Sequence, residues 1–268
     1  MPIAHLEDRA VIAVTGPEAR GFLQGLVTND VDALAPGKGL YAALLTPQGK
    51  VLFDFFLAEG DGAILIDCAA PARDALLKRL SMYKLRAKVA LEARNQLAVI
   101  ASDDDVAPSS AIPYPDPRLV EFGWRAFIAH GEMPVALSSA ATYHARRRAL
   151  GVPEAADFGS DKMFALDADL DELHAVDFTK GCYVGQELTA RMKHRGTARK
   201  RLLAFEAASA TPGTAVKAGD KDIGEIASFD GSHGFALIRL DRLAEAGDAP
   251  LLTDAGSVNL IKPSWLSS

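Results

Sequence analysis

Cysteine is scarce in this chain of 268 residues, which contains only Cys68 and Cys182. A disulfide framework of the kind that stabilises small secreted domains is excluded, and one bridge between the two cysteines is the alternative to two reduced thiols. Apolar runs are short, and none approaches the roughly 18–20 residues that span a bilayer. The N-terminal residues MPIAHLEDR lack the apolar region of a signal peptide. We therefore predict reduced thiols and a cytoplasmic location.

A large excess of charge is also absent, since the formal net charge is −6. This argues against a general nucleic-acid-binding or membrane-surface protein. The sequence has no CxxC, no HExxH and no closely spaced histidines, and two cysteines are too few for a self-held iron–sulfur cluster. No GxGxxG follows a strand, and the P-loop and GxSxG patterns are missing. We expect no metal held by this chain alone, no dinucleotide fold and no serine-hydrolase site.

The first hundred residues do contain alternating strand and helix signals. Short apolar runs end in turns, and two segments with apolar side chains at helical spacing begin at Pro17 and Pro71. The predicted strands cover 9–16, 40–46, 50–58, 63–68 and 88–93, and the predicted helices cover 17–30 and 71–87. The order β-α-β-β-β-α-β indicates an α+β sheet with helices on one face.

The later sequence changes in character twice. Residues 102–118 are rich in Asp, Pro and Ser and indicate a connector, followed by a predicted hairpin over 118–130 and a helix over 138–151. From about Lys200, short β runs alternate with turns, which is typical of a small antiparallel barrel or sandwich. We predict an N-terminal α+β lobe over 1–101, a second α+β lobe over 102–198 and a small β-barrel over 199–268.

Cys182 lies in an unusual setting, between Gly181 and Gly185 and close to Lys180. Glycines allow backbone angles that other residues avoid and let a ligand approach the main chain. The residues after Gly185 predict a helix, whose positive N-terminal end, together with Lys180, favours a thiolate. This indicates a reactive or ligand-facing thiol. A cysteine packed in a glycine-containing turn is the alternative.

A dense group of cations follows the cysteine. It consists of Arg191, Lys193, Arg195, Arg199, Lys200 and Arg201. In an acidic protein such a group indicates a local site for a phosphate, a carboxylate tail or RNA. A solvated face is the alternative, and Glu187 has the spacing to pair with Arg191 on one helix face.

Asp54 interrupts the apolar run VLFDFFLA, where an ionised carboxylate is costly if it is buried without a partner. Strand alternation directs it to solvent in one interpretation. In the other it faces a cleft and accepts a hydrogen bond from a polar ligand, or a proton. The sequence leaves both open.

Residues 180–191, KGCYVGQELTAR, resemble the signature K-G-C-[FY]-x-G-Q-E-x-x-[AS]-R of the YgfZ-type family. Its members are folate-binding relatives of the glycine-cleavage T-protein, an aminomethyltransferase, and are implicated in maintaining iron–sulfur enzymes. Residues 16–31 and 44–57 resemble the family's N-terminal blocks, so the resemblance covers most of residues 9–205. It implies an α+β, T-protein-like ring of three lobes that ends in an antiparallel β-barrel, with tetrahydrofolate or a related folate in a central hole.

The resemblance also implies the site. Cys182 and Asp54 take the catalytic positions, as functional thiol and as acid/base group. The implied folate contacts are Gln24, Asn29, Tyr143, Arg147, Lys180, Gly181, Cys182, Tyr183, Gln186, Glu187 and Arg191.

Several positions depart from the patterns of these families, among them Ala165 and Leu166, which stand where the family usually has Pro-Glu or Pro-Gln. Ala149 stands where T-proteins have a glutamate, Phe53 precedes Asp54 where T-proteins tend to have paired aspartates, and Asp169 replaces the family asparagine. These departures weaken the case for aminomethyl transfer, and we expect a weakened or altered folate site.

Three functions are compatible with these residues. The leading hypothesis is a tetrahydrofolate-binding accessory protein for the assembly or repair of iron–sulfur enzymes, with Cys182 as its thiol and iron–sulfur assembly proteins or client enzymes as partners. The alternatives are a tetrahydrofolate-dependent aminomethyl transferase that uses Asp54, and an RNA-binding module linked to tRNA modification, which the acidic composition disfavours. Catalytic turnover is left open. We expect a monomer with no membrane partner and no direct nucleic-acid binding.

Overall fold

The computed structural model describes residues 1–103, 106–194, 196 and 199–267, and the chain divides into two compact units. The first unit comprises residues 1–45, 52–145 and 173–184, and the second comprises 46–51, 146–172 and 185–268. The chain therefore passes between the units several times. The three-domain division expected from the sequence stays a prediction.

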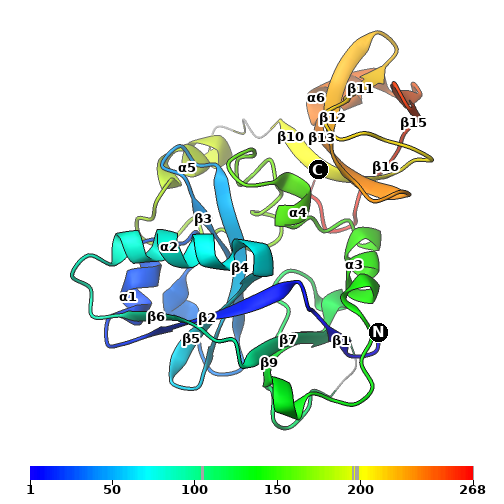
Figure 1. Ribbon diagram of the computed structural model, residues 1–268. Coiled ribbons are helices and arrows are strands. Elements are labelled where there is room, and N and C mark those ends of the chain that lie inside the picture. Colours follow the sequence, from blue (N-terminus) through cyan, green and yellow to red (C-terminus); the bar gives the residue numbers. More distant parts are fainter. Residues whose placement is uncertain (104–105, 195, 197–198, 268) are drawn as a thin grey trace. The chain divides into compact units, whose positions relative to one another are not determined.

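The first unit contains a five-stranded sheet with the strand order β3-β4-β5-β2-β6 (Figure 1). Its elements follow the predicted β-α-β-β-β-α-β order. They are β2 (Arg9–Thr15), α1 (Ala19–Gln24), β3 (Gly39–Leu45), β4 (Val51–Gly60), β5 (Ala63–Ala69), α2 (Arg73–Lys84) and β6 (Ala90–Ala93). A short 3-10 helix at Val31–Ala33 and another at Ala70–Ala72 connect them.

Both helices pack on one face of this sheet. Leu23 of α1 and Leu76 and Leu80 of α2 join the same core cluster as alternate strand residues such as Ile12 and Val14. Alternate residues of a strand face the same side of the sheet, and residues three or four apart in α2 face the same side of the helix. Their apolar side chains therefore pack together in one layer. This confirms helices on one face.

A second, four-stranded sheet of the same unit has the order β1-β7-β9-β8. Its strands are β1 (Ala4–His5), β7 (Leu97–Ser102), β8 (Ile112–Pro115) and β9 (Trp124–Ala129), and α3 (Ala140–Ala149) follows after 3-10 turns at Val120–Phe122 and His130–Glu132. The hairpin predicted over 118–130 is wrong. β9 is the one strand in this range, because its antiparallel partners are β7 and β8, and β8 lies inside the predicted connector.

The second unit contains the predicted antiparallel barrel, which is confirmed as a seven-stranded sheet with the order β15-β14-β11-β12-β13-β10-β16. Its strands are β10 (Lys200–Glu206), β11 (Ala215–Ala218), β12 (Lys221–Phe229), β13 (His233–Arg239), β14 (Leu251–Thr253), β15 (Gly256–Ser257) and β16 (Asn259–Ile261). The helices of this unit are α4 (Ala155–Phe158), α5 (Gln186–His194) and α6 (Leu240–Ala246).

Candidate functional site

Cys182 is exposed, and it lies in an irregular segment four residues before α5 begins. The neighbouring Tyr183 is buried, so the segment is anchored beside its exposed thiol. Gly185 has φ +82°, a left-handed angle that suits glycine. Gly181 does not have a positive φ, and no atom lies within 4 Å of a Cβ built on it. The backbone therefore requires glycine at 185, whereas Gly181 leaves open space next to the thiol.

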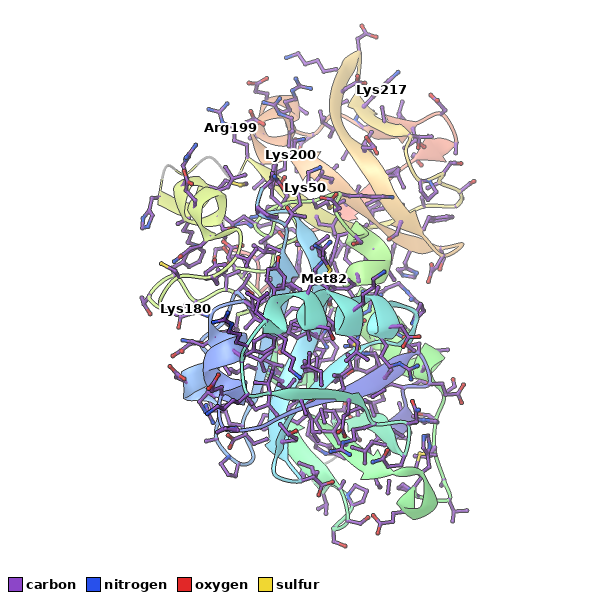
Figure 2. The ribbon with its side chains drawn as sticks, turned by 60° about the vertical axis from the view of Figure 1, so that its left-hand side comes forward. Lys50, Met82, Lys180, Arg199, Lys200 and Lys217 are labelled. Atoms are coloured by element: carbon purple, nitrogen blue, oxygen red, sulfur yellow. The ribbon has the colours of Figure 1, made fainter. Side chains whose placement is uncertain are left out.

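Lys180 fixes this segment to the N-terminal part of the same unit (Figure 2). Its Nζ donates to the carbonyl oxygens of Gln24 at 2.9 Å, Val27 at 2.7 Å and Asn29 at 2.6 Å. An ammonium group has three N–H donors, and all three are used by these carbonyls. Burial lowers the pKa of Lys180 from 10.5 to about 8. These bonds give Lys180 a structural role, and its predicted effect on the Cys182 thiol stays a prediction.

Gln24 and Asn29 shape the loop that receives Lys180. The amide of Asn29 donates at 2.7 Å to the carbonyl oxygens of both Tyr41 and His174. The amide of Gln24 donates to Asp30 Oδ1 at 2.7 Å, and its Oε1 accepts from the Val31 N–H at 2.7 Å. The structure therefore brings Gln24, Asn29 and Lys180 together through contacts with the protein.

Asp54 is 3% exposed on β4, which overturns the solvent-facing interpretation. Its Oδ2 accepts a hydrogen bond from the Tyr41 hydroxyl at 2.8 Å. Tyr41 stacks on Phe56, with ring centroids 4.9 Å apart. Asp54 thus lies at the edge of a buried aromatic group.

Tyr143 belongs to a buried network of charged side chains that the sequence analysis missed. Its hydroxyl oxygen accepts hydrogen bonds from Arg118 and, at 2.7 Å, from Arg125. Arg125 also donates to Asp67 Oδ2 at 3.1 and 2.5 Å, and its guanidinium lies 4.1 Å from the centroid of Phe56. Arg125 and Asp67 each interrupt an apolar strand, as Asp54 does, and that shared signal marks the network in the sequence.

Arg147, in the second unit, is buried and paired inside the protein. Its Nη1 donates at 2.6 Å to both the Val152 carbonyl oxygen and Asp157 Oδ2, and Ser228 donates to the other oxygen of Asp157. Arg147 therefore joins the last residues of α3, which belong to the second unit, to α4 and to the barrel strand β12 of the same unit. These contacts are structural.

Carboxylates pair with three of the cations after Cys182. Arg191 pairs with Glu187 at 2.5 Å on the exposed face of α5, and Gln186 is the first residue of that helix. Lys193 lies 3.2 Å from Asp171, and Arg201 donates to the same carboxylate at 2.8 Å. Arg199 and Lys200 are exposed (Figure 2), and Arg195 lies outside the described residues. This pairing weakens the argument for a phosphate or RNA site.

The acidic segment 167–172, which contacts Arg201, contains two buried carboxyl groups with raised pKa values. Asp169 is fully buried, has φ +59°, and places Oδ1 3.7 Å from Arg201 Nε. Burial raises the pKa of Asp169 well above its usual value. Burial also raises the pKa of Asp167 from 3.8 to about 6, against the opposing effect of Lys200 and Arg201. A neutral side chain suits both positions, as the family asparagine at 169 does.

We expect the Asp167→Asn protein to be more stable than the native chain by about 1–2 kcal/mol above pH 7. Because folding raises the pKa of Asp167, the folded state binds this proton more tightly than the unfolded state does. The stabilisation of the folded state by this proton is complete below pH 3.8 and is lost as the pH rises through about 6. The advantage of Asn should therefore shrink as the pH falls. Urea unfolding across this pH range measures it, with the exposed Asp61→Asn as control, and a difference that does not change with pH contradicts the prediction.

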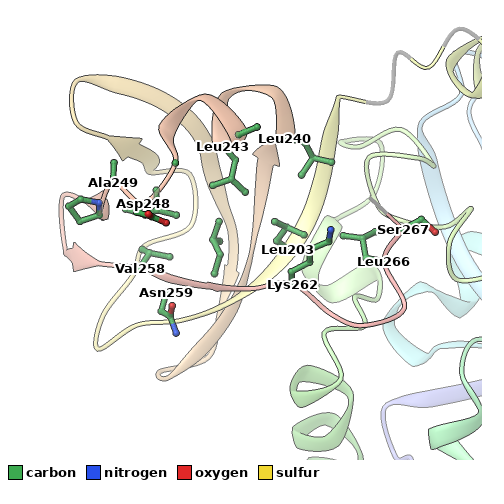
Figure 3. Close-up of a pocket in the computed structure, with 15 residues that line it drawn as sticks. Leu203, Leu240, Leu243, Asp248, Ala249, Val258, Asn259, Lys262, Leu266 and Ser267 are labelled. Atoms are coloured by element: carbon green, nitrogen blue, oxygen red, sulfur yellow. The ribbon is translucent and has the colours of Figure 1, made fainter.

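A cavity of about 750 Å³ lies in the barrel, between α6 and the strands β10, β14 and β16 (Figure 3). Its lining is mainly apolar and includes Leu203, Leu240, Leu243, Val258 and Leu266. None of the site residues predicted from the sequence lines it. Among the described residues, no group of three or more His, Cys, Asp or Glu side chains is arranged to hold a metal ion, and no helix is long and apolar enough to cross a membrane.

Comparisons with known proteins agree with this fold. The family described as "CAF17, C-terminal beta-barrel domain" matches residues 199–268. The glycine cleavage system aminomethyltransferase T from Bartonella henselae has a similar structure, with a TM-score of 0.76 and 14% identity over 98% of this chain and 86% of that one. This likeness confirms the predicted T-protein-like fold class.

Three curated relatives have related sequences. The mitochondrial iron–sulfur cluster assembly factor IBA57 of Mus musculus is 31% identical over 97% of this chain and 84% of its own length, and that of Homo sapiens is 32% identical over 89% and 78%. A mitochondrial homologue from Neurospora crassa is 35% identical over 75% of this chain, which spans about half of that relative's length.

These relatives overturn the predicted cytoplasmic location, because their names place them in mitochondria. The scarcity of cysteine indicated a reducing environment but did not specify the compartment. The resemblance to iron–sulfur-related proteins is confirmed, whereas folate binding stays a prediction. On these similarities, the chain belongs to the IBA57 family of iron–sulfur cluster assembly factors.

Proposed function

We propose that this protein is an accessory factor in the assembly or repair of iron–sulfur enzymes, and that Cys182 is its functional thiol. The observation that carries the proposal is the exposed sulfur of Cys182 on a segment whose neighbours, Lys180 and Tyr183, are buried. The names of the relatives support the assembly role. Activity of iron–sulfur enzymes in cells that depend on this protein is the measurement that tests it.

The segment around Cys182 is held from two sides within the first unit. Besides the three bonds made by Lys180, Asp177 Oδ1 accepts from the backbone N–H groups of Thr179 at 2.6 Å and Lys180 at 3.1 Å. A residue positioned by such bonds presents its side chain without first having to order the backbone. The open space beside Gly181 gives a cluster, a persulfide or a partner protein room to approach the sulfur.

Cys68, the other thiol, does not suit this role. It is buried in β5, where burial raises its pKa to about 12. The thiolate is the form that binds metals, so Cys68 is inert at neutral pH. A cluster that reaches Cys182 is then cargo that takes its remaining ligands from another chain or from external thiols.

A reduced folate is the ligand that we propose for the first unit. The resemblance of residues 16–31 and 44–57 to folate-binding relatives supports it, and Asp54 is the group that we assign to the polar edge of the pterin. Asp54 is buried and ordered by Tyr41, which suits recognition of ring N–H donors by a carboxylate.

We expect tetrahydrofolate to bind the pure protein saturably, and Asp54→Asn to weaken that binding about tenfold, because a charge-assisted hydrogen bond is lost. Isothermal titration calorimetry measures both values, with Asp167→Asn as the matched control. Absence of binding by the native protein removes folate from the proposal and leaves the assembly role to be judged by Cys182.

A further inference from the structure

The outer side of α2 and the turn after it carry an excess of positive charge that the net charge of −6 hides. Residues 75–91 contain no acidic residue and five basic ones. We call this surface the α2 ridge, and its basic residues are Lys78, Arg79, Lys84, Arg86 and Lys88. None of the five side chains forms an ion pair or a hydrogen bond with another described residue, in contrast to three of the cations after Cys182.

The carboxylates at the borders of the ridge already have partners. Asp74 pairs with Arg73 at 2.9 Å, and Glu92 lies 3.4 Å from Arg94. Glu18 accepts a hydrogen bond from the backbone N–H of Lys88 at 3.0 Å. The positive field of the ridge is therefore available to an anionic surface outside the chain.

Two large apolar side chains protrude among these cations. Met82 is 62% exposed and Leu85 is 89% exposed, and Figure 2 shows Met82 on α2. The inner face of the helix is already used, since Leu76 and Leu80 are fully buried in the core. Met82 and Leu85 are thus exposed apolar side chains that the core of the first unit does not use.

The backbone conformation at position 85 is also unfavourable for a leucine. It caps the C-terminus of α2 with φ 43° and ψ −106°, in the region where glycine is the usual residue. A side chain with a Cβ is strained there, and a leucine is in addition poorly hydrated. Neither local conformation nor solvent favours leucine at this position, so a contact outside the chain is its remaining physical reason.

We propose that the α2 ridge binds the surface of an anionic phospholipid membrane, with Leu85 and Met82 entering the boundary between headgroups and acyl chains. Exposed apolar side chains surrounded by Lys and Arg have the chemistry of a peripheral membrane anchor. Lysine is depleted from protein–protein interfaces, and three of the five cations are lysines. Single-stranded RNA favours exposed aromatic side chains, whereas the ridge's one aromatic residue, Tyr83, packs against the core.

This inference is independent of Cys182 and of folate. The fluid surface of a bilayer accepts cations in any arrangement, so it requires no acidic residue to set a register, and the ridge has none. Binding of this kind places the protein at a membrane without a spanning segment, and it departs from the expectation of no membrane partner, which rested on the net charge of the whole chain.

Sedimentation with vesicles tests the proposal. The probes are vesicles of phosphatidylcholine alone and of phosphatidylcholine with phosphatidylserine in a three-to-one ratio, at low and high salt. We expect the full chain to bind only the anionic vesicles and to be released by high salt. Leu85→Gly should weaken binding about tenfold. The triple variant Lys84→Ala, Arg86→Ala, Lys88→Ala should weaken it about a hundredfold.

Two features keep the test decisive. Leu85→Gly suits the left-handed backbone, so its thermal unfolding temperature should not fall, and lost binding then reflects the missing side chain. The matched controls are Val135→Gly, another exposed apolar residue, and the triple variant Lys38→Ala, Lys217→Ala, Lys262→Ala, which removes the same charge elsewhere. Failure to bind anionic vesicles, equal binding by the ridge variants, or tRNA binding through the same cations without vesicle binding would each overturn the proposal.

Discussion

The Cys182→Ser protein should fold normally and lose its support of iron–sulfur enzymes. The substitution replaces one exposed atom, so the free energy of unfolding should change by no more than about 0.5 kcal/mol. A serine hydroxyl is not ionised at neutral pH and does not replace a thiolate as a metal ligand. Activities of iron–sulfur enzymes should therefore remain as low in cells expressing this variant as in cells without the protein.

Cys68→Ala is the matched control, because it removes the other thiol. It should cost a small amount of stability from the loss of buried volume, and function should be kept.

Gly181→Val tests the open space beside the sulfur: the backbone at 181 accepts a side chain, yet the added methyl groups should hinder a partner's approach. Normal enzyme activities with Cys182→Ser would exclude the thiol from the mechanism.

Arg125→Met should destabilise the protein by about 3–5 kcal/mol, since it leaves the charge of Asp67 buried with fewer partners. Arg125 is 1% exposed, and its guanidinium joins Asp67, Tyr143 and the ring of Phe56. Methionine keeps most of the volume but supplies no donor. Urea unfolding of the full chain measures the loss.

Arg148→Met provides the comparison. Arg148 and Asp230 are 2.7 Å apart, but their side chains are 25% and 37% exposed, so solvent screens the pair. Its loss should cost no more than about 1 kcal/mol. A similar loss of unfolding free energy in the two variants would show that burial is not the reason for the large contribution of the Arg125 network.

The sequence was sufficient to predict the sheets where periodicity and turns agree. The strands and helices of the first sheet follow their predicted order because Pro17, Pro71 and the turn residues mark the element boundaries locally. The barrel was predictable for the same reason. The hairpin over 118–130 was not, because the pairing of β9 with β7 and β8 depends on residues distant in the chain.

The pairing of charged side chains was the property least predictable from the sequence. The cations from Arg191 to Arg201 looked most like an anion site, yet Asp171 and its neighbours pair with two of them and Glu187 pairs with a third. The sequence analysis assigned no role to the five cations of the α2 ridge, and they have no such partners among the residues that the structure describes. Neutralisation depends on which segments meet in space, and spacing along the chain does not reveal it.

The segment around Cys182 likewise combines features that local sequence predicts with contacts that it does not. The helix after Gly185 was predicted from local residues, whereas the same residues left open whether Cys182 is exposed or packed in a turn. The partners of Lys180 were not, since its three acceptors lie 151 to 156 positions earlier in the chain.

Those three carbonyl bonds have a consequence for the order of events during synthesis. Residues 24–29 leave the ribosome long before Lys180, and contacts between such distant segments close late in folding. By the time Cys182 is synthesised, the carbonyl groups that hold its segment are already present in the chain. The sulfur reaches its final position only when these early residues and Lys180 have come together, so an ordered thiol indicates that the two ends of the first unit have met.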